Sequence, residues 1–112
     1  MNPDRSAVVA TTTTPTRPEA ERIAHELVQR RLAACVQLVD PIRSVYRWEG
    51  QVQEDSEVLL VIKSVAALIP AIEGLLRELH PYEVPELLAV RVAAGSRAYL
   101  DWLEECVLTP PP

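Results

Sequence analysis

Residues 80–86, HPYEVPE, gather more chemically active side chains than any other stretch of the chain. They include one of the two histidines, one of the three tyrosines and two glutamates. Imidazole nitrogen suits Cu(II) and Zn(II), and carboxylate oxygen suits harder divalent ions. His80, Glu83 and Glu86 are therefore candidate metal ligands. The two prolines favour a second interpretation, a stiff connector between a helix and a strand, because each restricts the residue before it to extended geometry.

His80 is a weak metal site on its own, because useful affinity needs two or more ligands. Its place at the end of an expected helix also suits the helix dipole. The other histidine, His25, falls off the apolar stripe of its helix and receives no role. Cys35 is a soft ligand type and a further candidate, but its apolar neighbours Ala34 and Val36 favour core packing.

Lys63 ends an apolar strand, where a lysine either extends to water or meets an anionic group. Glu86 opens a neighbouring strand and is a candidate partner for it. The other interpretation places Lys63 in a ligand cleft between subunits. Tyr46, Trp48 and Tyr82 are candidates to line such a cleft, or to pack in a subunit interface.

No catalytic constellation is present in the sequence, which has no Ser-His-Asp pattern and only three glycines to build a phosphate loop. A net charge of −5 without a Lys/Arg cluster disfavours nucleic-acid binding. The acidic group Glu54, Asp55 and Glu57 is predicted to be a solvated edge.

The chain also lacks an apolar run of the roughly 20 residues that a membrane helix needs. It shows no signal-peptide pattern, and we expect a cytoplasmic protein with no membrane partner. Cys35 and Cys106 form no CxxC pair, so both are expected to be free thiols.

Hydrophobic periodicity predicts four strands and three helices in one domain, with residues 1–5 and 109–112 as flexible tails. Thr16 and Glu19 fit a capping box, Pro70 lies near the start of the second helix or kinks it, and Ser96 can cap the third. The order βαββαβ plus one helix is the α+β, ferredoxin-like arrangement. The strands are expected at residues 6–13, 35–46 (broken at Asp40-Pro41), 52–63 and 86–92.

Two of these strands are apolar on both faces, at residues 58–62 (VLLVI) and 87–90 (LLAV). A sheet with one wet face should alternate apolar and polar residues. A second layer must therefore cover the other face, and an oligomer is the economical answer. The second and third strands are expected to extend beyond the sheet as a hairpin arm, with a turn at residues 48–51.

Five separated motifs then carry a family resemblance: RRLAACV (30–36), SVYRWEG (44–50), VLLVIKS (58–64), ELHPYEVPELL (78–88) and YLDWL (99–103). In this order and spacing the chain resembles the CutA family of divalent-cation tolerance proteins. The resemblance implies a ferredoxin-like subunit in a homotrimer, similar in architecture to the PII signalling proteins. The copper ligands proposed for that family include a first-strand cysteine and a His-His pair, where this chain has Thr12, Leu79 and His80.

The resemblance thus predicts a non-enzymatic homotrimer of copper and divalent-cation tolerance, with Cu(II) or another divalent ion as its candidate cofactor. The alternatives are a PII-like small-molecule sensor that docks onto a partner protein, and a structural trimer that presents other proteins. The predicted metal ligands are His80, Glu83, Glu86 and Cys35. The predicted cleft or interface residues are Lys63, Tyr46, Trp48, Tyr82 and Glu86.

Overall fold

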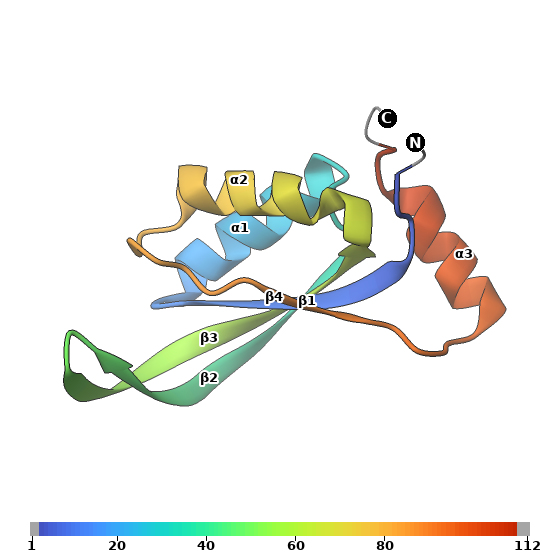
Figure 1. Ribbon diagram of the computed structural model, residues 1–112. Helices are drawn as coiled ribbons and strands as arrows, with labels where there is room; N and C mark the ends of the chain where they lie inside the picture. Colours follow the sequence, from blue (N-terminus) through green and yellow to red (C-terminus); the bar gives the residue numbers. More distant parts are fainter. Residues whose placement is uncertain (1–2, 110–112) are drawn as a thin grey trace.

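The computed structural model describes residues 3–109, and its elements follow the predicted βαββαβα order. Helices α1 and α2 lie side by side on one face of a four-stranded sheet, and α3 stands at one end of it (Figure 1). The elements are β1 (Ala7–Thr14), α1 (Arg17–Gln29), β2 (Cys35–Trp48), β3 (Gln51–Val65), a 3-10 turn (Ala66–Leu68), α2 (Ile69–Leu79), β4 (Leu88–Arg91) and α3 (Arg97–Cys106).

The strands are arranged in the order β2-β3-β1-β4, and every neighbouring pair is antiparallel. This topology confirms the ferredoxin-like fold. The core lies between the helices and one sheet face, where burial of each large apolar side chain contributes about 1.5–3 kcal/mol. Its fully buried residues include Ile23 and Leu27 of α1, Leu60 and Ile62 of β3, and Ile72 and Leu76 of α2.

Two of the three expected helix starts form as predicted. Pro70 lies in the first turn of α2, where its missing N–H costs nothing, so the helix begins there without a kink. The Ser96 hydroxyl caps α3 by accepting a hydrogen bond from the Tyr99 amide, at 3.2 Å. The prediction of a capping box at the start of α1 was wrong. Thr16 donates its hydroxyl proton to the Glu19 carboxylate and makes no side-chain bond to the backbone.

Strands β2 and β3 form the predicted hairpin arm. Only the part of β3 from Val58 onward pairs with β1, so residues 43–56 (the arm) are held by β2–β3 pairing alone. The ladder shifts register between Val39 and Ile42, as expected for a proline on an edge strand. At the tip, Glu49 and Gly50 have φ angles of 51° and 78°, the positive values that a tight hairpin turn requires.

The second face of the sheet, opposite α1 and α2, stays open in the single subunit. Strand register places alternate residues on this uncovered face, and Leu88 and Val90 are 68% and 65% exposed. Tyr99 of α3 reaches only one end of it, beside Lys63. The face is formed by Val9 and Thr11 of β1, Val39 of β2, Leu59, Val61 and Lys63 of β3, and Leu88 and Val90 of β4.

Candidate functional site

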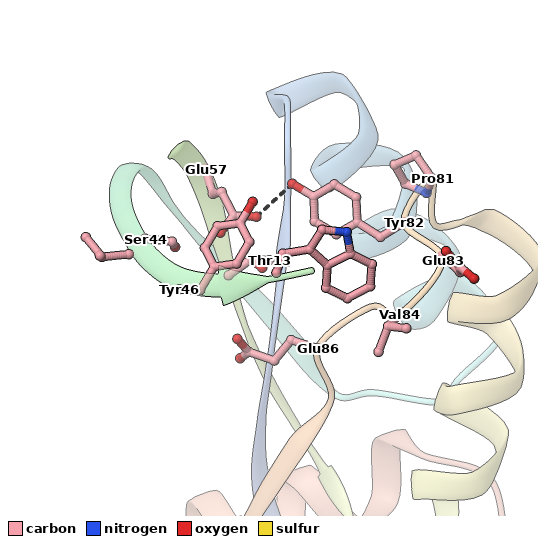
Figure 2. Close-up of a pocket in the computed structure, with 11 residues that line it drawn as sticks. Thr13, Ser44, Tyr46, Glu57, Pro81, Tyr82, Glu83, Val84 and Glu86 are labelled. Carbon is pink, nitrogen blue, oxygen red and sulfur yellow. Dashed lines mark hydrogen bonds between the residues drawn. The ribbon is translucent and has the colours of Figure 1, made fainter. Parts of the chain in front are cut away.

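A pocket of about 650 Å³ lies between the arm, the end of β1 and residues 80–87 (the connector). Figure 2 shows Tyr46 and Tyr82 beside Glu57, with Glu83 and Val84 on the opposite side. A volume of this size is typical of small-molecule sites. The lining residues are Thr13, Ser44, Val45, Tyr46, Trp48, Glu57, Pro81, Tyr82, Glu83, Val84 and Glu86.

The pocket brings together several predicted site residues. Tyr46 and Trp48 come from the arm, and Tyr82, Glu83 and Glu86 come from the connector. Segments far apart in sequence meet here because the chain returns from α2 past the end of β1 before it enters β4. The aromatic residues predicted to line a cleft therefore do line one within a single subunit.

Lys63 and Cys35 lie elsewhere. They are paired with each other across β2 and β3, and the Lys63 ammonium stands 5.7 Å from the centre of the Tyr99 ring. The predicted pairing of Lys63 with Glu86 was wrong, because β4 neighbours β1 and not β3. Glu86 instead accepts a hydrogen bond from the Thr11 hydroxyl at 2.8 Å.

His80 is buried and both of its ring nitrogens are engaged. Nε2 lies 2.7 Å from the Thr13 carbonyl oxygen, and Nδ1 lies 3.0 Å from the Tyr82 amide nitrogen. A carbonyl only accepts and an amide N–H only donates, so Nε2 carries the proton and Nδ1 is the acceptor. The His80 backbone N–H also closes α2 by donating to the Leu76 carbonyl at 2.8 Å.

The metal interpretation of residues 80–86 therefore lacks support within one subunit. A metal ion could bind His80 only by replacing one of its two hydrogen bonds. Within residues 3–109, no group of three or more His, Cys, Asp or Glu side chains is placed to hold a metal ion. His80 instead anchors the connector, whose extended geometry at His80 (φ −81°, ψ 136°) is that expected before a proline.

Glu57 is the charged pocket residue that sequence reasoning missed. It was predicted to lie on a solvated edge, yet it is only 7% exposed. The connector folds over it, and the Tyr82 hydroxyl donates to its Oε2 at 2.8 Å (Figure 2). A signal was present in the sequence, because Glu57 alternates with Leu59 and Val61 along one face of β3.

The pocket is acidic, and its tyrosine protons are already committed. The pKa of Tyr82 is raised by burial and then by its hydrogen bond to Glu57. The pKa of Tyr46 is raised chiefly by the hydrogen bond that its hydroxyl donates to Asp55. Three glutamates and no lysine or arginine line the pocket. What the pocket offers a ligand is therefore aromatic surface, negatively charged acceptors and the neutral donors of Ser44 and Trp48.

The pocket also adjoins the uncovered face. Register places Thr13 and Glu57 on the same side of the sheet as Thr11 and Leu59. Glu86, two residues before Leu88, bonds Thr11 on that side. A second subunit that covers this face would therefore reach the rim of the pocket.

Comparison with known proteins places these features in a family. Residues 8–106 match the family model described as CutA1 divalent ion tolerance protein. The chain is 47% identical over 93 residues to the divalent-cation tolerance protein CutA of Thermus thermophilus, covering 83% of this chain and 90% of that protein. It is 44% identical over 100 residues to human Protein CutA, covering 89% of this chain but spanning only 56% of the human protein.

Solved structures of CutA1 proteins share the fold of this chain. The crystal structure of CutA1 from Oryza sativa matches with a TM-score of 0.90 at 37% identity, covering 94% of this chain and 96% of that one. The structure of the Thermus thermophilus protein matches with a TM-score of 0.88 at 44% identity, covering 90% and 98%.

The cellular compartment stays a prediction. The relative from Arabidopsis thaliana, 43% identical over 88% of this chain and spanning 54% of that protein, is named chloroplastic. Within residues 3–109, none of the helices has the length and hydropathy required to cross a bilayer.

Burial of Tyr82, and then its hydrogen bond to Glu57, predict a late tyrosine titration. Because the folded protein keeps Tyr82 protonated where an unfolded tyrosine ionises, near pH 10, this contact stabilises the fold below that pH and loses its contribution above it. We expect Glu57→Gln to lower the pKa of Tyr82 by removing the negative neighbour. Phenolate absorbance at 295 nm measures the titration, with Tyr82→Phe identifying the signal. An unchanged high-pH titration in Glu57→Gln would contradict the contact.

Proposed function

This chain belongs to the CutA1 divalent ion tolerance family, and from that premise we propose that it serves divalent-cation tolerance as a non-enzymatic homotrimer that binds a small ligand in the pocket beside the arm. The observation that carries the proposal is the pocket itself, which opens next to the uncovered sheet face. Ligand binding at a subunit boundary gives a sensor a direct way to alter its assembly.

The oligomer is supported by surfaces that a lone subunit leaves open. Val39, Leu88 and Val90 present apolar side chains to water on the uncovered face. Strands β2 and β4 leave both sheet edges without a partner among the described residues, and free edges in soluble proteins are normally covered or paired. A closed ring of three satisfies the edges and the face together, and three is the number that the family resemblance implies.

The proposal gives His80 an anchoring role. Its Nε2 bond to Thr13 holds the connector against β1, its Nδ1 bond fixes the Tyr82 amide within the connector, and that placement delivers Tyr82 to Glu57. Direct binding of Cu(II) by His80, Glu83, Glu86 and Cys35 would need ligands from more than one subunit. The pocket favours small-molecule sensing over both that metal site and a purely structural trimer, which needs no ligand.

Assembly can be tested at Val90. Val90→Asp places a charge on the uncovered face, and burying an unpaired carboxylate in an interface costs several kcal/mol. We expect light scattering after size exclusion to give three chain masses for the natural protein and one for Val90→Asp. Val28→Asp, an equivalent change on the solvent side of α1, is the control and should stay trimeric. A trimer that survives Val90→Asp would show that this face is not the interface.

Copper binding can be tested at the two histidines. Because both His80 nitrogens are engaged, we expect His80→Gln and His25→Gln to leave the Cu(II) Kd, measured against a competing chelator, within about twofold of the natural value. A loss of about tenfold or more, equal to about 1.4 kcal/mol, confined to His80→Gln in a protein of unchanged mass, would restore His80 as a copper ligand.

The role in tolerance can be tested in cells. In a bacterial strain that lacks its own protein of this family, we expect the chain to raise the Cu(II), Zn(II) or Co(II) concentration that halves the growth rate. Val28→Asp should do the same, and Val90→Asp should not, because assembly is required. No difference between the natural chain and an empty vector for any of the three metals would overturn the proposed function.

A further inference from the structure

We propose that the pocket selects a small organic cation, a protonated amine with an apolar body, as its ligand. This inference rests on the proposed ligand-binding function and names the chemistry of the ligand. It is argued from one carboxylate that lines the pocket, the aromatic walls around it and a lining without lysine or arginine.

The carboxylate of Glu57 offers one oxygen to the pocket. Among residues 3–109, its one hydrogen bond comes from the Tyr82 hydroxyl to Oε2, and Oε1 receives none. Oε1 is not sealed from solvent, because Thr12 Oγ1 is the only enclosed side-chain polar atom without a partner among the described residues. Glu57 lines the pocket, so a cation inside can pair with this oxygen in place of water.

The walls fit a cation with an apolar body. Tyr46, Trp48 and Tyr82 contribute three aromatic rings to a cavity of about 650 Å³. A ring face attracts a cation, and the attraction is stronger where water is excluded. Glu86 adds a second carboxylate, of which only Oε2 accepts a hydrogen bond, from Thr11. The pocket thus combines rings with negatively charged acceptors.

Anionic ligands do not fit this chemistry. No lysine or arginine lines the pocket, and Glu57, Glu83 and Glu86 would repel an anion. The hydroxyl protons of Tyr46 and Tyr82 are held by Asp55 and Glu57, so neither phenol can donate to a ligand without giving up a carboxylate.

A bare metal ion fits less well than an organic cation. Divalent ions take several oxygen ligands that converge within about 2–2.6 Å, and the described residues form no group of three suitable side chains. A phenol is protonated at neutral pH and is then a poor metal ligand, and the raised pKa values of Tyr46 and Tyr82 make the deprotonation that a metal would require harder still.

The test uses a charge series of similar shape: benzylamine, benzyl alcohol and benzoate. Binding is followed by the fluorescence of Trp48, which is the only tryptophan left in a Trp102→Phe background, because the chain has two. We expect saturable binding of benzylamine at neutral pH, at least about tenfold tighter than benzyl alcohol. Benzoate should give no saturable signal.

Two isosteric variants locate the effect. Glu57→Gln keeps an oxygen to accept the Tyr82 hydrogen bond and removes the charge, so benzylamine should bind about tenfold more weakly. Glu54→Gln is the matched control, since Glu54 lies on the arm, pairs with Arg43 and does not line the pocket. The affinity of Glu54→Gln for benzylamine should equal that of the Trp102→Phe background protein.

Four outcomes would overturn the inference: equal binding of benzylamine and benzyl alcohol, no saturable binding of benzylamine, saturable binding of benzoate, or displacement of benzylamine by stoichiometric Cu(II). Failure of the proposed function itself is seen separately, in the mass and growth measurements.

Discussion

The candidate site depends on one imidazole. His80 joins the Thr13 carbonyl at the end of β1 to the Tyr82 amide in the connector, and its own amide closes α2. Three elements are thereby tied together at one point. The bond to Thr13 is buried and the bond from Tyr82 is partly buried, and a hydrogen bond away from water is stronger and its loss is costly. With the connector held, Tyr82 is delivered to Glu57 and Glu86 to Thr11. A residue chosen by type as a metal ligand thus serves the site as a positioning residue.

Much of the fold could be predicted from the sequence, because the patterns behind it are local. Hydrophobic periodicity located the helices and strands. Ser96 caps α3 as expected from its residue type. The turn at Gly50 and the register shift near Pro41 follow from backbone restrictions on single residues. Strand β4 came out shorter than expected, at Leu88–Arg91, because residues before Leu88 follow the connector and not the β1 ladder.

The site was harder to predict, because it depends on which segments meet. Residue type selected Tyr46, Trp48, Tyr82 and Glu86 as residues of a ligand cleft or subunit interface, and all four line one pocket of the single subunit. It failed for Lys63, whose strand is separated from β4 by β1. It also failed for Glu57, whose exposure is decided by a connector more than twenty positions later. Neighbours that far apart in sequence leave no periodic signal, and strand order is a property of the whole chain.

The pocket and the uncovered face are linked by shared strands. Thr13, Glu57 and Glu86 line the pocket on the side of the sheet where Leu59 and Leu88 form part of the uncovered face. A ligand that binds the assembled form more tightly than the free subunit must stabilise the assembly by the same free energy. The arm contributes Tyr46 and Trp48 to the pocket and is held only by β2–β3 pairing, so it is the element best able to respond. A small cation held between Glu57 and these rings would then report its own concentration as a change in arm order and subunit contact.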